Sequence, residues 1–235
     1  MMKLDVFLND FAVRCFRDTA DADYIAARLS YRAGLTAQYL WSSQQAIEKY
    51  LKCILLLNRI KAGDVNHDLD AAQKRVEMNG IALNLTPVSK AFISHVDSCA
   101  QCRYLEISWF SFGREIVELD RAVWELRRFC TLDEEPRRVS LRDGSPAPKI
   151  RIAGGQLEKI LDNAQHPARA PLLWQNGFFG KRIRRRVRAW AGFTAVNSPL
   201  FLYPQFVDEV AKYVRLPNPL RKAYREAARE RHQEE

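Results

Sequence analysis

Apolar residues recur at helical spacing through much of the first 135 positions. Between residues 40 and 60 they fall seven, four, three and three positions apart, at Leu40, Ile47, Leu51, Ile54 and Leu57. Steps of three, four and seven place side chains on one face of an α-helix. The pattern therefore predicts a long amphipathic helix over this segment.

Other segments of the same part share the helical pattern. Asp21 is the expected N-cap of a helix that reaches residue 39, and a helix begins at the run 66–69. Pro87 opens a further helix, and the last one covers about residues 113–131. Strand-like alternation is nearly absent, so we predict an all-α fold, an antiparallel bundle of four or five helices.

The helical pattern stops near Pro136. Residues 137–153 hold Gly144, Pro146 and Pro148 and show little periodicity, which is typical of a loop or linker. We therefore predict a helical bundle over residues 1–135, a linker over 136–152 and a basic, mostly helical region over 153–235.

Charge separates the same two parts of the chain. The 235 residues contain 37 basic and 28 acidic side chains, a net charge of +9. Residues 1–135 carry 17 basic and 19 acidic side chains, whereas residues 136–235 carry 20 and 9. The positive field of the second part is expected to attract a polyanion such as RNA, DNA or an anionic lipid surface.

The apolar runs and the cysteines of the sequence indicate where in the cell the protein is located. The most apolar unbroken run, residues 53–57, is too short to span a bilayer, and the first residues lack the apolar core of a signal peptide. We therefore expect a cytoplasmic protein without a membrane partner, whose five cysteines are thiols. Phosphate-binding glycine loops are absent from the sequence, and no cofactor is predicted.

The strongest binding signal is a basic run in the second part. Six of eight positions in 181–188 are basic, namely Lys181, Arg182, Arg184, Arg185, Arg186 and Arg188. Ile183, Val187 and Trp190 share one side of the helix that this segment would form. Its basic face is expected to contact phosphates with little sequence preference. Docking on an acidic protein remains an alternative.

One stretch of the bundle has a recognisable signature. The run Gln44-Gln45-Ala46-Ile47-Glu48-Lys49-Tyr50-Leu51-Lys52 resembles the second-helix signature of HEPN domains, helical domains linked to nucleotide and RNA biology. Weaker similarities lie at 24–28, at 66–69 and at Arg103-Tyr104, so the resemblance covers about residues 15–130. It implies a homodimer.

The resemblance carries two functional expectations. Many HEPN domains are metal-independent ribonucleases that use Arg-x(4–6)-His, often followed by x-Tyr, at a dimer interface. Others lack the pair and bind nucleotides, or accompany a nucleotidyltransferase in toxin–antitoxin pairs. A nucleotidyltransferase-type partner and a role in prokaryotic defence are therefore expectations for this chain.

This chain departs from the ribonuclease motif. After Arg103, Ser108 stands where the histidine would be and Phe110 where the tyrosine would be. Serine is a poor general base at neutral pH without an activating neighbour. We therefore predict a protein that binds RNA or a nucleotide, with Arg103 and His67 as weak catalytic candidates. An active ribonuclease that pairs Arg103 with a histidine from elsewhere, and a non-catalytic assembly module, are the alternatives.

Further residues in the bundle could bind a ligand. Arg103, Tyr104, Gln45 and Lys49 are the expected nucleotide or RNA contacts, although Gln45 and Lys49 also fit a solvated helix face with i,i+4 pairs. We expect His67 and Asp68 to form part of a helix cap, and an acid–base pair is the alternative.

A separate motif has the spacing of metal ligands. His95, Cys99 and Cys102 would share one helix face and form a weak metal candidate, for which burial in the core is the alternative.

Overall fold

The protein was analysed as a computed structural model that describes residues 4–63, 65, 67–99, 108–130, 155–180, 193–196, 198–214 and 216–234. Within its described residues, the first part contains six α-helices, with a π-helical turn over Ala12–Arg17 that joins the first two. They are α1 (Leu4–Phe11), α2 (Asp18–Arg32), α3 (Thr36–Leu57), α4 (Leu69–Met78), α5 (Pro87–Cys99) and α6 (Glu115–Arg127). The predicted all-α class is confirmed.

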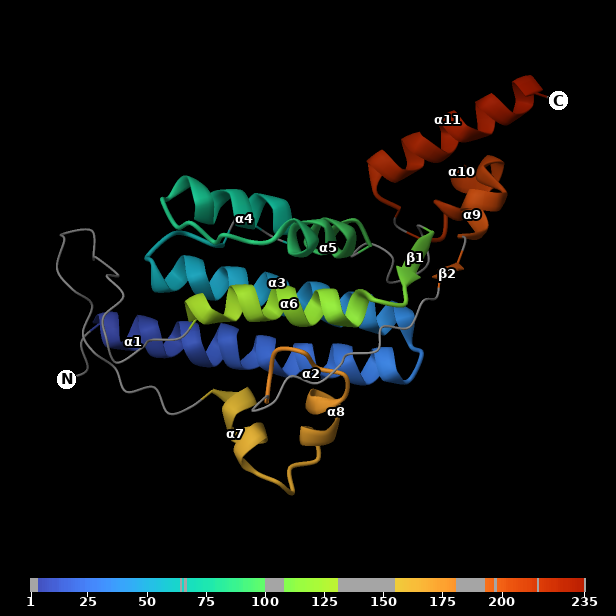
Figure 1. The fold of residues 1–235 in the computed structure, drawn as a ribbon. Helices are drawn as coiled ribbons and strands as arrows, with labels where there is room; N and C mark the ends of the chain where they lie inside the picture. The colour runs from blue at the N-terminus through green and yellow to red at the C-terminus, as the bar shows by residue number, and fades with distance from the viewer. Residues whose placement is uncertain are drawn as a thin grey trace.

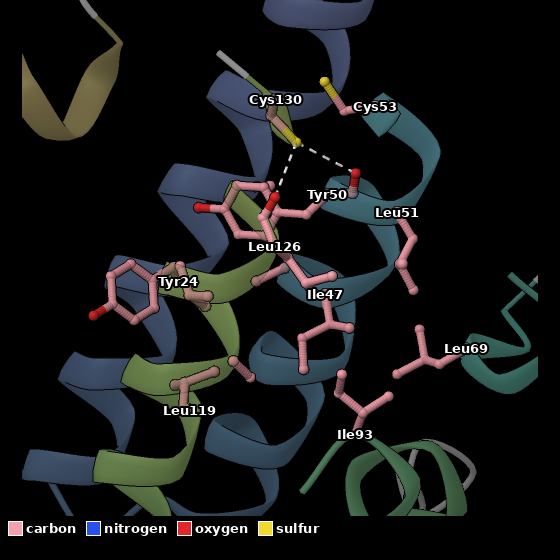
Figure 2. Packing of buried hydrophobic residues seen from close by; sticks show 14 of the residues in the cluster. Tyr24, Ile47, Tyr50, Leu51, Cys53, Leu69, Ile93, Leu119, Leu126 and Cys130 are labelled. Atoms are coloured by element: carbon pink, nitrogen blue, oxygen red, sulfur yellow. Dashed lines mark hydrogen bonds between the residues drawn. The ribbon is translucent and has the colours of Figure 1, made fainter. Parts of the chain in front are cut away.

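The long helices α2, α3 and α6 lie side by side, and α4 and α5 cover the other side of α3 (Figure 1). The predicted apolar stripe of α3 is central, because Ile47, Leu51 and Ile54 are all fully buried. They pack with apolar side chains of the neighbouring helices, such as Leu69, Ile93, Leu119 and Leu126 (Figure 2). This core fixes the positions of the polar side chains described below.

Several helix boundaries differ from the prediction. Asp21 is not an N-cap but a fully buried residue inside α2, where it pairs with Arg127. The helix ends at Arg32 because Gly34 adopts a left-handed φ of +72°, which favours glycine, and α3 then begins at Thr36. α3 ends at Leu57, three residues before the end of the predicted helix at residue 60.

The structure also contains one short two-stranded ribbon. β1 (Trp109–Phe112) pairs antiparallel with β2 (Phe193–Val196). Phe, Trp, Val and Thr are good strand formers. Segments of four residues are too short to show alternation in the sequence, and their pairing depends on contacts more than 80 positions apart.

Residues 155–180 share the core of the bundle. They contain α7 (Gln156–Asp162) and α8 (Arg169–Leu173), which pack against α2. Their side chains Leu157, Ile160 and Leu172 are buried in the same apolar cluster as α3. Nothing in these contacts separates residues 155–180 from the bundle as an independent unit, although the predicted limits at 135 and 153 lie in undescribed chain.

The last residues form a small lobe. α9 (Pro199–Leu202), a 3-10 turn (Pro204–Phe206), α10 (Val207–Val210) and α11 (Asn218–Glu234) gather around four buried side chains: Leu200, Val207, Leu216 and Tyr224. The ribbon leads from the bundle to this lobe (Figure 1). Within the described residues, no helix is long and apolar enough to cross a membrane.

Candidate functional site

Glu48 is the centre of a polar cluster on α3. Its side chain is only 6% exposed, yet it accepts hydrogen bonds from several donors. Lys52 Nζ lies 2.6 Å from Oε1, His67 Nδ1 lies 2.9 Å from Oε2, and the amides of Gln44 and Gln45 lie 3.4 Å from Oε2. A buried carboxylate needs such donors, since its charge is costly to desolvate.

The contact with Glu48 fixes the tautomer of His67. A carboxylate only accepts hydrogen bonds, so Nδ1 of His67 carries a proton and Nε2 remains for other partners. The side chain of His67 is 71% exposed. The backbone carbonyl of His67 accepts a hydrogen bond of 3.0 Å from Gln44 Nε2. The ring is therefore held from one side and open to solvent on the other.

The predicted helix cap is present beside it. Asp68 is the N-cap of α4 and accepts a 2.7 Å hydrogen bond from Ala71 N. Leu69 N donates to Asp97 Oδ1 of α5 at 3.0 Å. This bond ties the turn that carries His67 to the last turn of α5.

Gln45 and Lys49 do not form the pair that their spacing suggests. The Lys49 ammonium contacts Asp23 of α2, and Gln45 Nε2 donates to Gln44 Oε1 at 2.7 Å. The predicted Glu48–Lys52 pair is present. Because Gln44 and Glu48 are buried, this side of α3 is not a fully solvated face.

A second cluster joins α5, β1 and α6. His95 Nε2 lies 3.2 Å from Glu115 Oε1, an ion-pair contact without the alignment of a hydrogen bond, and His95 Nδ1 lies 3.8 Å from Cys99 Sγ. Glu115 also accepts from Ser111 Oγ at 2.9 Å and from Phe112 N at 2.7 Å. The carboxylate is therefore fixed from the strand as well as from the histidine.

The charge state of His95 follows from these neighbours. Burial opposes the charged ring, but the interactions with Cys99 and Glu115 outweigh it and raise the pKa of His95 to about 10. An imidazole with such a pKa is a cation at neutral pH. It is poorly suited to accept a proton from a substrate.

Ser108 and Phe110 have packing partners. Ser108 Oγ accepts a 2.9 Å hydrogen bond from Ser198 N, at the start of the lobe. The ring of Phe110 lies 4.7 Å from the ring of His95, centroid to centroid. The two positions at which the ribonuclease motif would place histidine and tyrosine thus carry a strand-to-lobe contact and an aromatic contact.

Several predicted residues lie outside the described part of the chain. These are Asn66, Cys102, Arg103, Tyr104 and the basic run from Lys181 to Arg188, with its members Arg182, Arg184, Arg185 and Arg186. The structure brings His95 and Cys99 together, while their predicted third ligand Cys102 is among the undescribed residues. In the described chain, no group of three or more His, Cys, Asp or Glu side chains could hold a metal.

Sequence reasoning missed the partners of both histidines. Glu115 follows Ser111 and Phe112 by four and three positions, which is an ordinary local contact, but its meeting with His95 depends on how α5 packs against α6. The Glu48–His67 pair spans 19 positions, and the two matching motif segments were its only signal.

Comparison with known families gives a match to part of the bundle. Residues 13–105 match the family model of the HEPN domain. Over these residues the chain is similar to the HEPN domain. The predicted resemblance is confirmed, although the match ends before β1 and α6, short of the expected limit near residue 130. Neither the curated proteins nor the solved structures gave a match to the chain.

The match covers the helices that hold the first cluster. The HEPN segment contains α2–α5 and so both Glu48 and His67. The matched family is linked to nucleotide- and RNA-related biology, and its members are often ribonucleases or toxins.

Proposed function

We propose that this HEPN protein binds RNA or a nucleotide without cleaving it, and that Arg103 and the basic run 181–188 supply the phosphate contacts. The observation that carries the proposal is the hydrogen bond between Ser108 Oγ and Ser198 N. The position that would hold the catalytic histidine carries a side chain that joins the strand to the lobe. Serine there has no basic neighbour among its described hydrogen-bond partners.

The ribbon connects to both segments that hold the proposed phosphate contacts. β1 follows residues 100–107, which include Arg103 and Tyr104, and β2 follows residues 181–192, which include the basic run. In the ribbon Trp109 pairs with Val196 and Phe112 pairs with Phe193. Because the pairing is antiparallel, the two segments rejoin the described chain at opposite ends of this four-residue ribbon.

Charge supports the same assignment. Residues 136–197 hold 13 basic and 3 acidic side chains, while residues 198–235 hold 7 and 6. The positive field of the C-terminal part thus belongs to the stretch before the lobe. Several phosphate contacts from that stretch would give binding that depends strongly on salt and weakly on sequence.

A second candidate, a metal-independent ribonuclease, is favoured by one observation. His67 is oriented by a buried glutamate, exposes Nε2, and sits on a turn bonded to the last turn of α5, from which the chain continues to Arg103. A histidine held in this way could take a proton from a ribose 2′-hydroxyl while Arg103 holds the phosphate. In this form the histidine comes from the turn before α4 instead of the usual motif.

The two candidates are separated by one experiment. Purified protein with EDTA is incubated with single-stranded and structured RNA, and samples are run on mobility-shift and denaturing gels. We expect a shift without cleavage, weakened by Arg103→Ala and abolished when Arg184, Arg185 and Arg188 are changed to Glu. His67→Gln should leave the shift unchanged.

Two results would change the assignment. Cleavage that disappears in both Arg103→Ala and His67→Gln would establish the ribonuclease and contradict the binding-only proposal. Neither shift nor cleavage would contradict both candidates and leave a module that docks on an acidic protein.

A further inference from the structure

In the second cluster, Cys99, His95 and Glu115 are arranged like the side chains around an activated nucleophile. Cys99 Sγ lies 3.8 Å from His95 Nδ1, and the opposite nitrogen of the same ring lies 3.2 Å from Glu115 Oε1. A thiol, an imidazole and an orienting carboxylate in sequence are the arrangement that activates cysteine in many proteins. In this chain the thiol and the imidazole stand one helical turn apart on α5.

The carboxylate is held firmly enough to orient the ring. Glu115 is 1% exposed, and Ser111 Oγ and Phe112 N both donate to it. Phe110 covers the imidazole at a centroid distance of 4.7 Å, so the ring has little freedom to turn away. The raised pKa of His95 is consistent with a cation clasped between Cys99 and Glu115.

Other charged and titratable groups near the ring favour the cation too. Glu118 of α6 acts on His95 through its charge, and Arg114 at the start of α6 offsets part of that carboxylate. Tyr31 and Tyr39 lie close enough to feel the charge of Glu115, and burial raises the pKa of both phenols, which keeps them neutral. The net field at the ring is therefore negative.

We propose that Cys99 is a peroxide-reactive cysteine, held as a thiolate by the imidazolium of His95, which Glu115 orients. Imidazolium favours the ionised form of a neighbouring thiol because the opposite charges attract. In the reaction the thiolate sulfur attacks one peroxide oxygen and an S–O bond forms. The O–O bond breaks, and the second oxygen leaves as hydroxide and takes a proton from solvent. Sulfur is oxidised by two electrons to a sulfenic acid, and the peroxide is reduced to water.

The other described cysteines are internal references. Cys53 and Cys130 are fully buried, and burial raises the pKa of Cys130, so both are expected to be inert. Cys15 is exposed and represents an ordinary surface thiol. Cys99 is 7% exposed, which admits a small reagent such as hydrogen peroxide better than the two core thiols do.

The test follows alkylation of each cysteine in the folded full-length chain. Protein with EDTA is pulsed with iodoacetamide at pH values from 6.5 to 8.5, and labelled peptides are quantified by mass spectrometry. An ordinary thiol reacts roughly tenfold faster per pH unit in this range because only the thiolate attacks. We expect the rate for Cys99 to change less than about twofold over the whole range, while the rate for Cys15 rises steeply.

Two variants test whether His95 causes the flat pH dependence of the alkylation rate of Cys99. His95→Gln should give Cys99 the steep pH dependence of Cys15, while His166→Gln, a matched histidine replacement elsewhere, should leave the flat profile unchanged. Thermal melting checks that both variants fold. If His95→Gln does not fold, the wild-type profile alone still decides, because a rate for Cys99 that rises in parallel with that of Cys15 overturns the proposal.

Peroxide reactivity is measured directly in a second arm. The protein is treated with hydrogen peroxide in the presence of dimedone, which traps sulfenic acids. We expect the adduct at Cys99 and its loss in His95→Gln. Adducts at Cys15 without any at Cys99 would overturn the proposal, even if the alkylation profile is flat.

Discussion

Three buried carboxylates of the described chain are each matched by a specific cation. Asp21 meets Arg127, Asp120 meets Arg28, and Glu48 meets Lys52. A spacing of four residues predicted the last of these pairs from the sequence. The other two join positions about 90 to 105 apart, so only the packing of α2 against α6 reveals them.

The Arg28–Asp120 pair gives a prediction at this scale. Both side chains are fully buried, and Arg28 also donates to the backbone carbonyl of Pro171 at 3.1 Å. Asp120→Ala leaves the guanidinium without its anion, so we expect the free energy of unfolding to fall by about 3–5 kcal/mol. Urea unfolding measures this loss. Asp70→Ala, which removes an exposed partner of Lys74, is the matched control and should change little. Equal losses of stability in Asp120→Ala and Asp70→Ala would contradict the stabilising role of the buried Arg28–Asp120 pair.

His95 gives a second prediction, about pH. Its folded pKa of about 10 lies above the ordinary value of 6.5, so the folded state holds the proton more tightly than the unfolded state. The stabilisation is complete below about pH 6.5 and is lost as pH rises toward 10. We expect urea unfolding to show a decline in stability between pH 7 and 10 that is much smaller in His95→Gln. The same decline in the wild type and in His95→Gln would contradict the raised pKa of His95.

At the scale of elements, long periodic segments were predicted well and short or interrupted ones poorly. The stripe of α3 and the start of α5 at Pro87 follow from local spacing and from proline chemistry. The start of α2 was wrong because Asp21 serves a distant arginine and not its own helix end. The β ribbon was missed because four residues show no period.

The cap of α4 gives a prediction at the scale of one helix. Asp68 accepts the only side-chain cap bond described for that helix, from Ala71 N at 2.7 Å. We expect Asp68→Ala to cost about 1 kcal/mol in urea unfolding, while Asp68→Asn, which keeps a cap acceptor, should cost much less. Equal losses would show that the carboxylate charge and not the cap bond matters.

At the scale of the whole molecule, the bundle helices and residues 155–180 form one packed unit, and the lobe 198–234 is attached through the ribbon (Figure 1). The sequence placed a boundary between the bundle and everything after residue 152. It could not reveal that α7 and α8 complete the bundle core, because Leu157 and Leu172 are unremarkable apolar residues until packing places them against α2. For the candidate site, the sequence indicated His67 and His95 as candidates. It did not indicate that Glu48 and Glu115 are their partners.

Truncation tests this division. Removing residues 198–235 deletes the lobe, whose buried apolar side chains form their own cluster, so the melting temperature of the remaining chain should stay close to that of the full protein. Removing residues 155–235 also deletes Glu158, the partner of Arg127, and exposes the core beneath α7 and α8. We expect that chain to melt at least several degrees lower or to aggregate. Equal melting temperatures for the two truncations would contradict the shared core.

The proposed binding of RNA through phosphate contacts of the basic residues is tested most directly by the salt dependence of affinity. Dissociation constants for a single-stranded RNA are measured from 50 to 300 mM salt for the wild type, for Arg103→Ala and for Arg184, Arg185 and Arg188 changed to Glu. Each lost phosphate contact should lower the slope of log affinity against log salt by about 0.7. The account predicts a reduction of about 0.7 for Arg103→Ala and of about 2 for the triple variant, with no change when the lobe residues Lys222 and Arg229 become Glu. Slopes that are the same in all four proteins would contradict it.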